Sequence, residues 1–199
     1  MNKGERTKQE ILRQSIIYSC QFGLADITIG TVSKLCNLSR TGVISHFKNK
    51  EDMQIAILGF GEALFKENVI STSYDKDPLT HVKNLLQNWI NWTAQIFEQH
   101  HVSCPFIKAV IEFQNRPPSK VRSFCLEQQD RLLEYLTHRV NRCIEAKQID
   151  SRFEAKAIAY QLYSLYLGHL YTQHSDVIKQ SDLHFSSSVS KLLKSYSSQ

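Results

Sequence analysis

The sequence is poor in the residues that interrupt helices. It contains only 7 glycines and 4 prolines among 199 residues, whereas a fold of many short strands needs turn residues at frequent intervals. Apolar residues recur instead at spacings of three and four along most of the chain, which is typical of helices with one buried face. The sequence therefore predicts an all-α fold.

Signals for export and for membrane insertion are also missing. No apolar run approaches the roughly 18 residues that a membrane helix needs, and the amino terminus is too polar for a signal peptide. The five cysteines, at positions 20, 36, 104, 125 and 143, are odd in number and form no Cys-x-x-Cys pair. This favours reduced, buried thiols, so we expect a cytoplasmic protein with no membrane partner.

The sequence lacks the common catalytic motifs. It contains no Gly-x-Ser-x-Gly, no Walker loop and no Rossmann glycine pattern. His100, His101 and Cys104 come nearest to a metal-ligand set, but adjacent histidines cannot easily point at one ion and no fourth ligand is evident. We therefore expect no enzymatic activity, no metal and no cofactor.

Positive charge is concentrated in the first quarter of the chain. Residues 1–50 contain eight Lys or Arg and three Asp or Glu, a difference of +5 that equals the formal net charge of the whole chain. Such an asymmetry indicates a small module that meets a polyanion, joined to a larger module that does not. The alternative is a chance imbalance on a solvated surface.

Two short helices separated by a tight turn are predicted between residues 28 and 47. Thr28 is a suitable N-cap for a helix through Cys36, and Ser39 for a helix to about His46 or Phe47. Asn37, between them, tolerates the left-handed backbone conformation that a tight turn requires. This is the outline of a helix-turn-helix. The residues expected to pack its helices on each other and on helix 5–22 are Val32, Leu35, Leu38, Val43 and Phe47.

The other side of the third helix predicts a DNA-reading surface. Its side chains are short, apart from one arginine, and short side chains let a helix enter the major groove, which is about 12 Å wide. Glycine at position 42 costs a helix about 1 kcal/mol relative to alanine, which is sensible where the backbone approaches a phosphate or base. Lys50 and the first amides of the next helix predict an anion site. The predicted DNA-binding residues are Thr28, Ser39, Arg40, Thr41, Gly42, Ile44, Ser45, His46, Lys48 and Lys50.

We divide the chain at residue 50. Residues 1–50 are the predicted helix-turn-helix DNA-binding domain, and residues 51–199 are the predicted C-terminal regulatory domain, a helical bundle for ligand binding and dimerisation. A long helix from Lys50 to about Ser71 is expected to link the two.

An aromatic-rich zone lies in the middle of the larger domain. Its large side chains either pack as ordinary core or enclose a cavity for an apolar or aromatic molecule. The residues that we assign to this ligand pocket are Trp89, Trp92, Phe97, Cys104, Phe106 and Phe113.

The helix predicted at residues 154–174 is apolar on nearly every side, so it must be buried on every side. It is either central to the monomer or shares one face with a second copy of the chain. The residues that we assign to a dimer interface, together with the preceding long helix, are Leu136, Val140, Leu162, Tyr166 and Leu170.

The order of these signals from Ile11 to Met53 resembles the amino-terminal domain of TetR/AcrR-type bacterial transcriptional regulators. In that family a first helix ends in Phe-x-x-Gly or a close variant, a Thr caps the second helix, and the recognition helix leads into His-Phe-x-x-Lys-Glu. Here the last motif is His46-Phe47-Lys48-Asn49-Lys50-Glu51. The resemblance is strong over residues 6–55, and weaker in CPFIKAVIEFQNRPPSKVRSF and YSLYLGHLY.

Two positions depart from the family pattern. The family usually has Gly where Asn37 stands, and an aromatic residue, most often Tyr, where Ile44 stands. That Tyr typically touches the DNA backbone, so Ile44 is expected to pack against a thymine methyl instead.

The resemblance implies an all-helical homodimer with one DNA-binding domain per subunit and a larger domain that binds a small molecule. We therefore expect a ligand-responsive repressor, which binds a palindromic operator in double-stranded DNA and is released by a small apolar or aromatic effector. The alternative is a helical adaptor that binds only protein.

Overall fold

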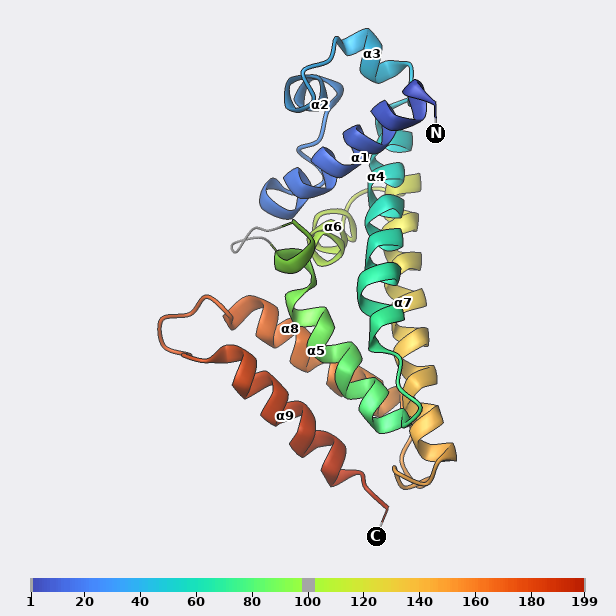
Figure 1. Cartoon of the computed structure of the whole chain (residues 1–199), viewed down its shortest axis with the longest axis vertical. Helices are drawn as coiled ribbons and strands as arrows, with labels where there is room; N and C mark the ends of the chain where they lie inside the picture. Colours follow the sequence, from blue (N-terminus) through green and yellow to red (C-terminus); the bar gives the residue numbers. More distant parts are fainter. Residues whose placement is uncertain (1, 98–102, 199) are drawn as a thin grey trace. The chain divides into compact units, whose positions relative to one another are not determined.

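A computed structural model of the chain describes residues 2–97 and 103–198 (Figure 1). Within these ranges the regular elements are helices, with one isolated β-bridge between Ile149 and Ser197. The predicted all-α fold is therefore confirmed. The chain divides into two compact units, described separately below: unit 1 contains Met1–Lys66 and Thr93–Gln129, and unit 2 contains Glu67–Trp92 and Asp130–Gln199. The functional boundary at residue 50 remains a prediction.

Unit 1 begins with four helices: α1 (Lys3–Phe22), α2 (Ile29–Leu35), α3 (Arg40–Ile44) and α4 (Lys50–Phe65). The start of α1 is fixed by a capping box, in which the Asn2 side chain accepts from the Glu5 amide and the Glu5 carboxylate accepts from the Asn2 amide. The later part of α5 (Pro78–Phe97), α6 (Pro105–Phe113) and the first part of α7 (Lys120–Glu145) complete the unit.

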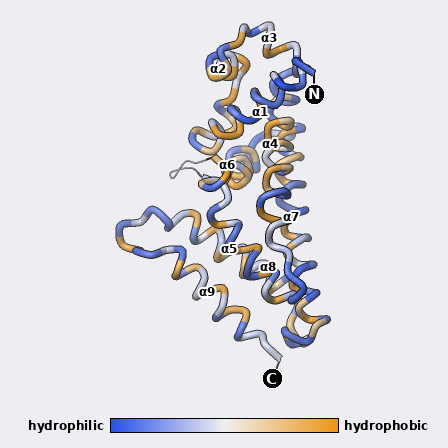
Figure 2. The backbone as a smooth tube through the Cα atoms, viewed as in Figure 1, coloured by the Kyte–Doolittle hydropathy of each residue, from blue (hydrophilic) through white to orange (hydrophobic). Residues whose placement is uncertain are grey.

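The most deeply buried hydrophobic side chains of unit 1 are aliphatic. Figure 2 shows hydrophobic and hydrophilic residues alternating along its helices, as expected for helices with one buried side. Each fully buried aliphatic side chain stabilises the fold by about 1.5–3 kcal/mol. The hydrophobic residues of unit 1 with no exposed surface are Ile11, Ile16, Leu24, Ile27, Val32, Val43, Met53, Ile57 and Leu58.

Three of the five residues predicted to pack the helix-turn-helix are buried, namely Val32, Val43 and Phe47. Leu38 is half-buried, and Leu35 has 38% of its surface exposed. The prediction that Leu35 is a packing residue is therefore wrong. Leu35 is the last residue of a seven-residue helix, where the core no longer covers it.

Unit 2 is built from parts of α5 and α7 and from α8 (Ala155–Thr172) and α9 (Ser181–Ser195). The predicted long helix from Lys50 is α4, and after Phe65 its winding changes to a π-helical turn, Lys66–Ile70, and a 3-10 turn, Ser71–Ser73. In the core of unit 2, the indole of Trp89 stacks on the ring of Tyr166 with a centroid separation of 4.3 Å. This aromatic contact joins α5 to α8 and contributes about 0.5–1.5 kcal/mol beyond the buried area.

His169 of α8 is buried beside α9. Its Nε2 atom lies 3.6 Å from Oδ1 of Asp182, and its ring centroid lies 5.1 Å from that of Phe185. Burial lowers the pKa of His169, and the nearby Asp182 carboxylate opposes this shift. The folded protein therefore favours the neutral imidazole.

The shifted pKa of His169 predicts a loss of stability in acid. Because the folded pKa lies below the unfolded value, about 6.5, the unfolded chain binds more protons below that pH, and stability falls as the pH drops through it. Between pH 7.5 and 5, we expect His169→Gln to lose less free energy of unfolding than the parent. Urea unfolding followed by tryptophan fluorescence reports on unit 2, which contains both tryptophans.

His184→Gln, which changes an exposed histidine of α9, serves as the control. Equal losses in the parent, His169→Gln and His184→Gln would contradict a buried neutral imidazole at position 169.

Gly23, which ends α1, is required by its conformation and by its neighbour. Its φ is 97° and its ψ 160°, a region that side-chain-bearing residues avoid. A Cβ atom built on it would overlap the carboxylate of Glu112 in α6. We expect Gly23→Ala to destabilise the protein by about 1–3 kcal/mol, measured by thermal unfolding.

Gly59→Ala is the matched control for Gly23→Ala. Gly59 lies inside α4, where a Cβ would meet nothing within 4 Å, so this change should stabilise by about 0.5–1 kcal/mol. A Gly23→Ala protein as stable as Gly59→Ala would show that the described backbone conformation at Gly23 is wrong.

Candidate DNA-binding surface

The turn between α2 and α3 has the predicted local structure. The Thr28 hydroxyl accepts from the Thr31 amide at 3.0 Å, and the Ser39 hydroxyl accepts from the Gly42 amide at 3.0 Å, so both predicted N-caps are present. Asn37 has a φ of 51°, the left-handed conformation expected there. These caps fix where the two short helices begin and therefore which residues of α3 face outward.

The outward side of α3 carries one cation, one hydroxyl and one aliphatic side chain, and all three are exposed. Arg40 and Thr41 are exposed, and within residues 2–97 and 103–198 their side chains make no hydrogen bond. Ile44 has 54% of its surface exposed. An isoleucine held this open on a short polar helix offers an apolar contact that the fold itself does not use.

The other predicted residues of α3 have structural roles as well. The Ser45 hydroxyl donates to the Gly42 carbonyl at 2.8 Å, and the Ser39 hydroxyl is occupied by its cap. A Cβ on Gly42 would lie 3.2 Å from that hydroxyl, so glycine here also makes room for the cap. His46 is half-buried beside Phe47, and α3 itself ends at Ile44, two or three residues earlier than predicted.

The start of α4 differs from the predicted anion site. The Asn49 side chain accepts from the Asp52 amide at 2.9 Å, and the Asp52 carboxylate accepts from the Lys48 amide at 3.0 Å. With Glu51 and Asp52 in its first turn, this helix end already carries negative charge. Lys48 and Lys50 are exposed, and Nζ of Lys50 donates to the Ala25 carbonyl at 3.2 Å. This corner therefore offers an anion the Lys48 ammonium and the remaining donors of Lys50, without the helix amides.

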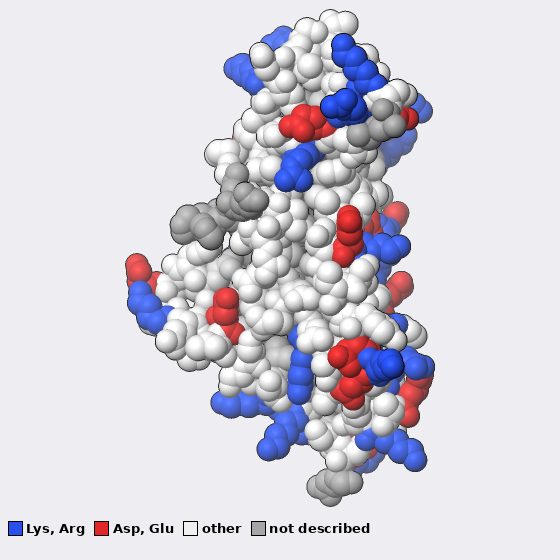
Figure 3. Space-filling model, in the orientation of Figure 1, with Lys and Arg blue, Asp and Glu red and all other residues white. Residues whose placement is uncertain are grey.

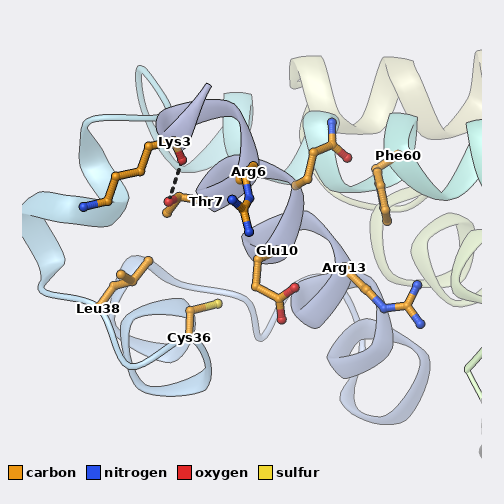
Figure 4. Close-up of a pocket in the computed structure, with 9 residues that line it drawn as sticks. Lys3, Arg6, Thr7, Glu10, Arg13, Cys36, Leu38 and Phe60 are labelled. Carbon is orange, nitrogen blue, oxygen red and sulfur yellow. Dashed lines mark hydrogen bonds between the residues drawn. The ribbon is translucent and has the colours of Figure 1, made fainter. Parts of the chain in front are cut away.

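Three basic residues of α1, with Glu10 between the second and the third, line a hollow beside the helix-turn-helix. The hollow measures about 880 Å³. In Figure 4 the α1 residues Lys3, Arg6 and Arg13 lie along it, opposite Cys36 and Leu38. The three cations stand three and seven residues apart, and this helical spacing was the signal available in the sequence.

The charge of unit 1 is uneven in the structure as it is in the sequence. Figure 3 shows Lys and Arg side chains around the end of unit 1 that carries α1, α2 and α3, with fewer acidic side chains between them. An exposed, unpaired face of α3 thus sits among cations, which is the arrangement that attracts a polyanion.

All six predicted pocket residues are buried. Trp89 and Trp92 belong to unit 2, whereas Phe97, Cys104, Phe106 and Phe113 belong to unit 1. In unit 1 the rings of Phe65 and Phe106 meet edge to face at 6.0 Å between centroids. A ligand pocket formed by these side chains remains a prediction.

The predicted dimer residues require a correction. Leu136, Val140, Leu162 and Tyr166 have at most 1% of their surface exposed in the single chain, so their side chains are core of unit 2 and a second copy cannot reach them. Leu170 is half-buried. The helical period marked α8 as apolar all round but could not tell which of its sides the same chain covers. The exposed residues of α8 are Lys156, Ala157, Tyr160, Ser164, Gly168 and Tyr171, and we call the side that Tyr160, Ser164, Gly168 and Tyr171 share its outward side.

Two further observations bear on other classes of function. His100 and His101 lie outside the described residues; among those that are described, no three His, Cys, Asp or Glu residues group as metal ligands. In the same part of the chain, every helix is too short or too polar to cross a bilayer.

Comparison with known proteins bears out the resemblance. Residues 78–176 match the model of the tetracyclin repressor-like C-terminal domain. The HTH-type transcriptional regulator AcrR of Shigella flexneri is 25% identical over 155 residues, which cover 74% of this chain and 68% of that protein. The chain belongs to the TetR/AcrR family of transcriptional regulators.

Solved structures share the fold. A TetR-family regulator from Cytophaga hutchinsonii superimposes with a TM-score of 0.83 at 18% identity, covering 100% of this chain and 98% of that one. AibR, in a complex with isovaleryl coenzyme A and operator DNA, has a TM-score of 0.67 at 15% identity and covers 92% of this chain and 95% of that one.

Proposed function

We propose that this TetR/AcrR-family protein is a cytoplasmic repressor, without enzymatic activity, that binds a palindromic operator as a homodimer. The exposed side of α3, which carries Arg40, Thr41 and Ile44, is the observation that carries the proposal. In a two-fold dimer, two such helices would enter major grooves about one helical turn apart.

The contacts that we propose divide into reading and positioning. Arg40 reads a guanine through its two parallel donors, and Ile44 packs on a thymine methyl. Thr28, Ser39, Thr41, Gly42, Ser45 and His46 support this reading surface or approach the backbone of the DNA. Lys48 and Lys50 bind phosphates, as do the cations of α1, and these contacts supply affinity without sequence preference.

Release by a small apolar or aromatic effector is also part of the proposal. AibR binds both a coenzyme A thioester and operator DNA, which supports a ligand-responsive mechanism in a chain of the same fold. A ligand acts here only if its affinity differs between the DNA-competent arrangement and another one. The buried aromatic residues Trp89, Trp92, Phe97, Phe106 and Phe113, with Cys104, are the proposed lining.

A second copy is proposed to cover the outward side of α8. Tyr160 and Tyr171 have 70% and 66% of their surface exposed, and Leu183 of α9 has 64%. Ser164 and Gly168 between the two tyrosines are small, so a partner helix could approach α8 closely there. This side replaces the buried residues that the sequence suggested.

Arg40→Ala tests the reading contact. We expect it to weaken binding to a duplex selected by the parent from a random pool by about 1–3 kcal/mol and to relax base preference at one position. Lys48→Ala, which also removes one positive charge, should weaken binding to all DNA sequences alike and reduce the salt dependence of binding. Fluorescence anisotropy at two salt concentrations separates the two.

Arg40→Ala protein with unchanged affinity and base preference would remove Arg40 from the reading surface. If the parent selects no duplex at low salt, the protein is better described as an adaptor that binds only protein.

Gly168→Arg tests the dimer surface. A Cβ at Gly168 meets nothing within 4 Å in the single chain, so the subunit should fold normally while the partner helix is blocked. We expect a monomer by analytical ultracentrifugation at concentrations where the parent is a dimer. Gly59→Arg, at another helical glycine with open space around its Cβ, should remain dimeric. A dimeric Gly168→Arg protein would exclude the outward side of α8.

A further inference from the structure

The last turn of α1 and the connection from α1 to α2, residues 23–28, are bound by side chains of α6. Nζ of Lys108 donates to the Gln21 carbonyl at 2.6 Å, and Oε2 of Glu112 accepts from the Ala25 amide at 2.9 Å. These residues are separated by 87 positions in the sequence. One helix thus binds both the end of α1 and the middle of the connection.

Two residues of α4 bind the same connection. Nε2 of Gln54, which is buried, donates to the Leu24 carbonyl at 2.9 Å, and Nζ of Lys50 donates to the Ala25 carbonyl at 3.2 Å. The backbone groups of a loop, which water would satisfy elsewhere, are here bound by side chains from two helices.

Lys108 and Glu112 are the only charged residues of α6, whose sequence is PFIKAVIEF. They stand four residues apart and therefore share one side of the helix. The remaining residues of α6 are buried apart from Ile111. The hydrogen bonds that these two side chains make to the backbone define where the connection lies, because hydrogen bonds are directional.

Gly23 allows α6 this close approach. Any side chain at position 23 would enter the space of the Glu112 carboxylate. The backbone of the connection therefore comes against α6 at Gly23, which has no side chain.

The position of α6 in the chain suggests a role for these contacts. It lies inside the region that matches the C-terminal domain of the family, residues 78–176, and yet it belongs to the compact unit that contains α2 and α3. The connection that it holds leads directly into Thr28, the cap of α2.

We propose that Lys108 and Glu112 are positioning residues for DNA recognition. They fix the α1–α2 connection to α6, so that the orientation of α2 and α3 follows any displacement of α6. This inference rests on the proposed function in DNA binding, and it adds a path that does not run along α4.

Glu112→Met distinguishes the effect of positioning on DNA affinity from the effect of charge. The change removes the acceptor for the Ala25 amide and makes the protein more positive by one, so electrostatics alone would tighten binding to DNA. We expect the opposite, a loss of about 2- to 30-fold in affinity for the duplex that the parent selects from a random pool. The salt dependence should match that of the parent, since no phosphate contact is removed.

Two matched variants accompany it. Glu112→Gln keeps an oxygen that accepts from the Ala25 amide and should bind like the parent. Glu127→Met removes the same charge from an exposed position of α7 in the same unit and should bind equally well or better. Amide hydrogen exchange without DNA should be faster at Ala25 in Glu112→Met alone.

The outcomes are distinct. A parent that selects no duplex ends the proposed function and this inference with it. A parent that binds, with Glu112→Met exchanging faster at Ala25 but binding as tightly as Glu127→Met, overturns the positioning role alone. Should Glu112→Met not fold, Lys108→Met is compared with Lys120→Met, an exposed lysine of α7; equal affinities of these two overturn the proposal.

Discussion

A helix of five residues has no stability of its own in water, and α3 is such a helix. It holds its place because Val43 within it and Phe47 just after it are buried in the core of unit 1, and because Ser39 caps its first turn. This anchoring leaves Arg40, Thr41 and Ile44 on the outside. The proposed recognition of DNA depends on that division of one short helix between the core and the solvent.

The same constraint makes the surroundings of α3 important. A short helix moves with whatever it is packed on, so its orientation is set by α1, by the connection into α2 and by α4. Side chains of α4 and α6 bind the backbone of that connection. The reading surface and the region matching the family's C-terminal domain are therefore joined within unit 1 by short, directional contacts.

Local features of the fold were predictable because local chemistry decides them. Thr28 and Ser39 are caps and Asn37 is left-handed, as their side chains suggested. The side that a helix turns toward its neighbours was less predictable. Leu162 and Tyr166 were assigned to a partner chain but are buried by their own, because periodicity identifies an apolar side and not what covers it. The hydrogen bonds of Lys108 and Glu112 join residues 87 positions apart, and no local sequence pattern predicts such contacts.

The most direct test of the account is a nuclear magnetic resonance titration of the labelled protein with a duplex that it has selected from a random pool. We predict the largest amide shift changes from Thr28 to Lys50, with smaller ones along the basic side of α1. Binding that leaves the amides of Arg40 to Ser45 unchanged would contradict the claim that α3 reads DNA.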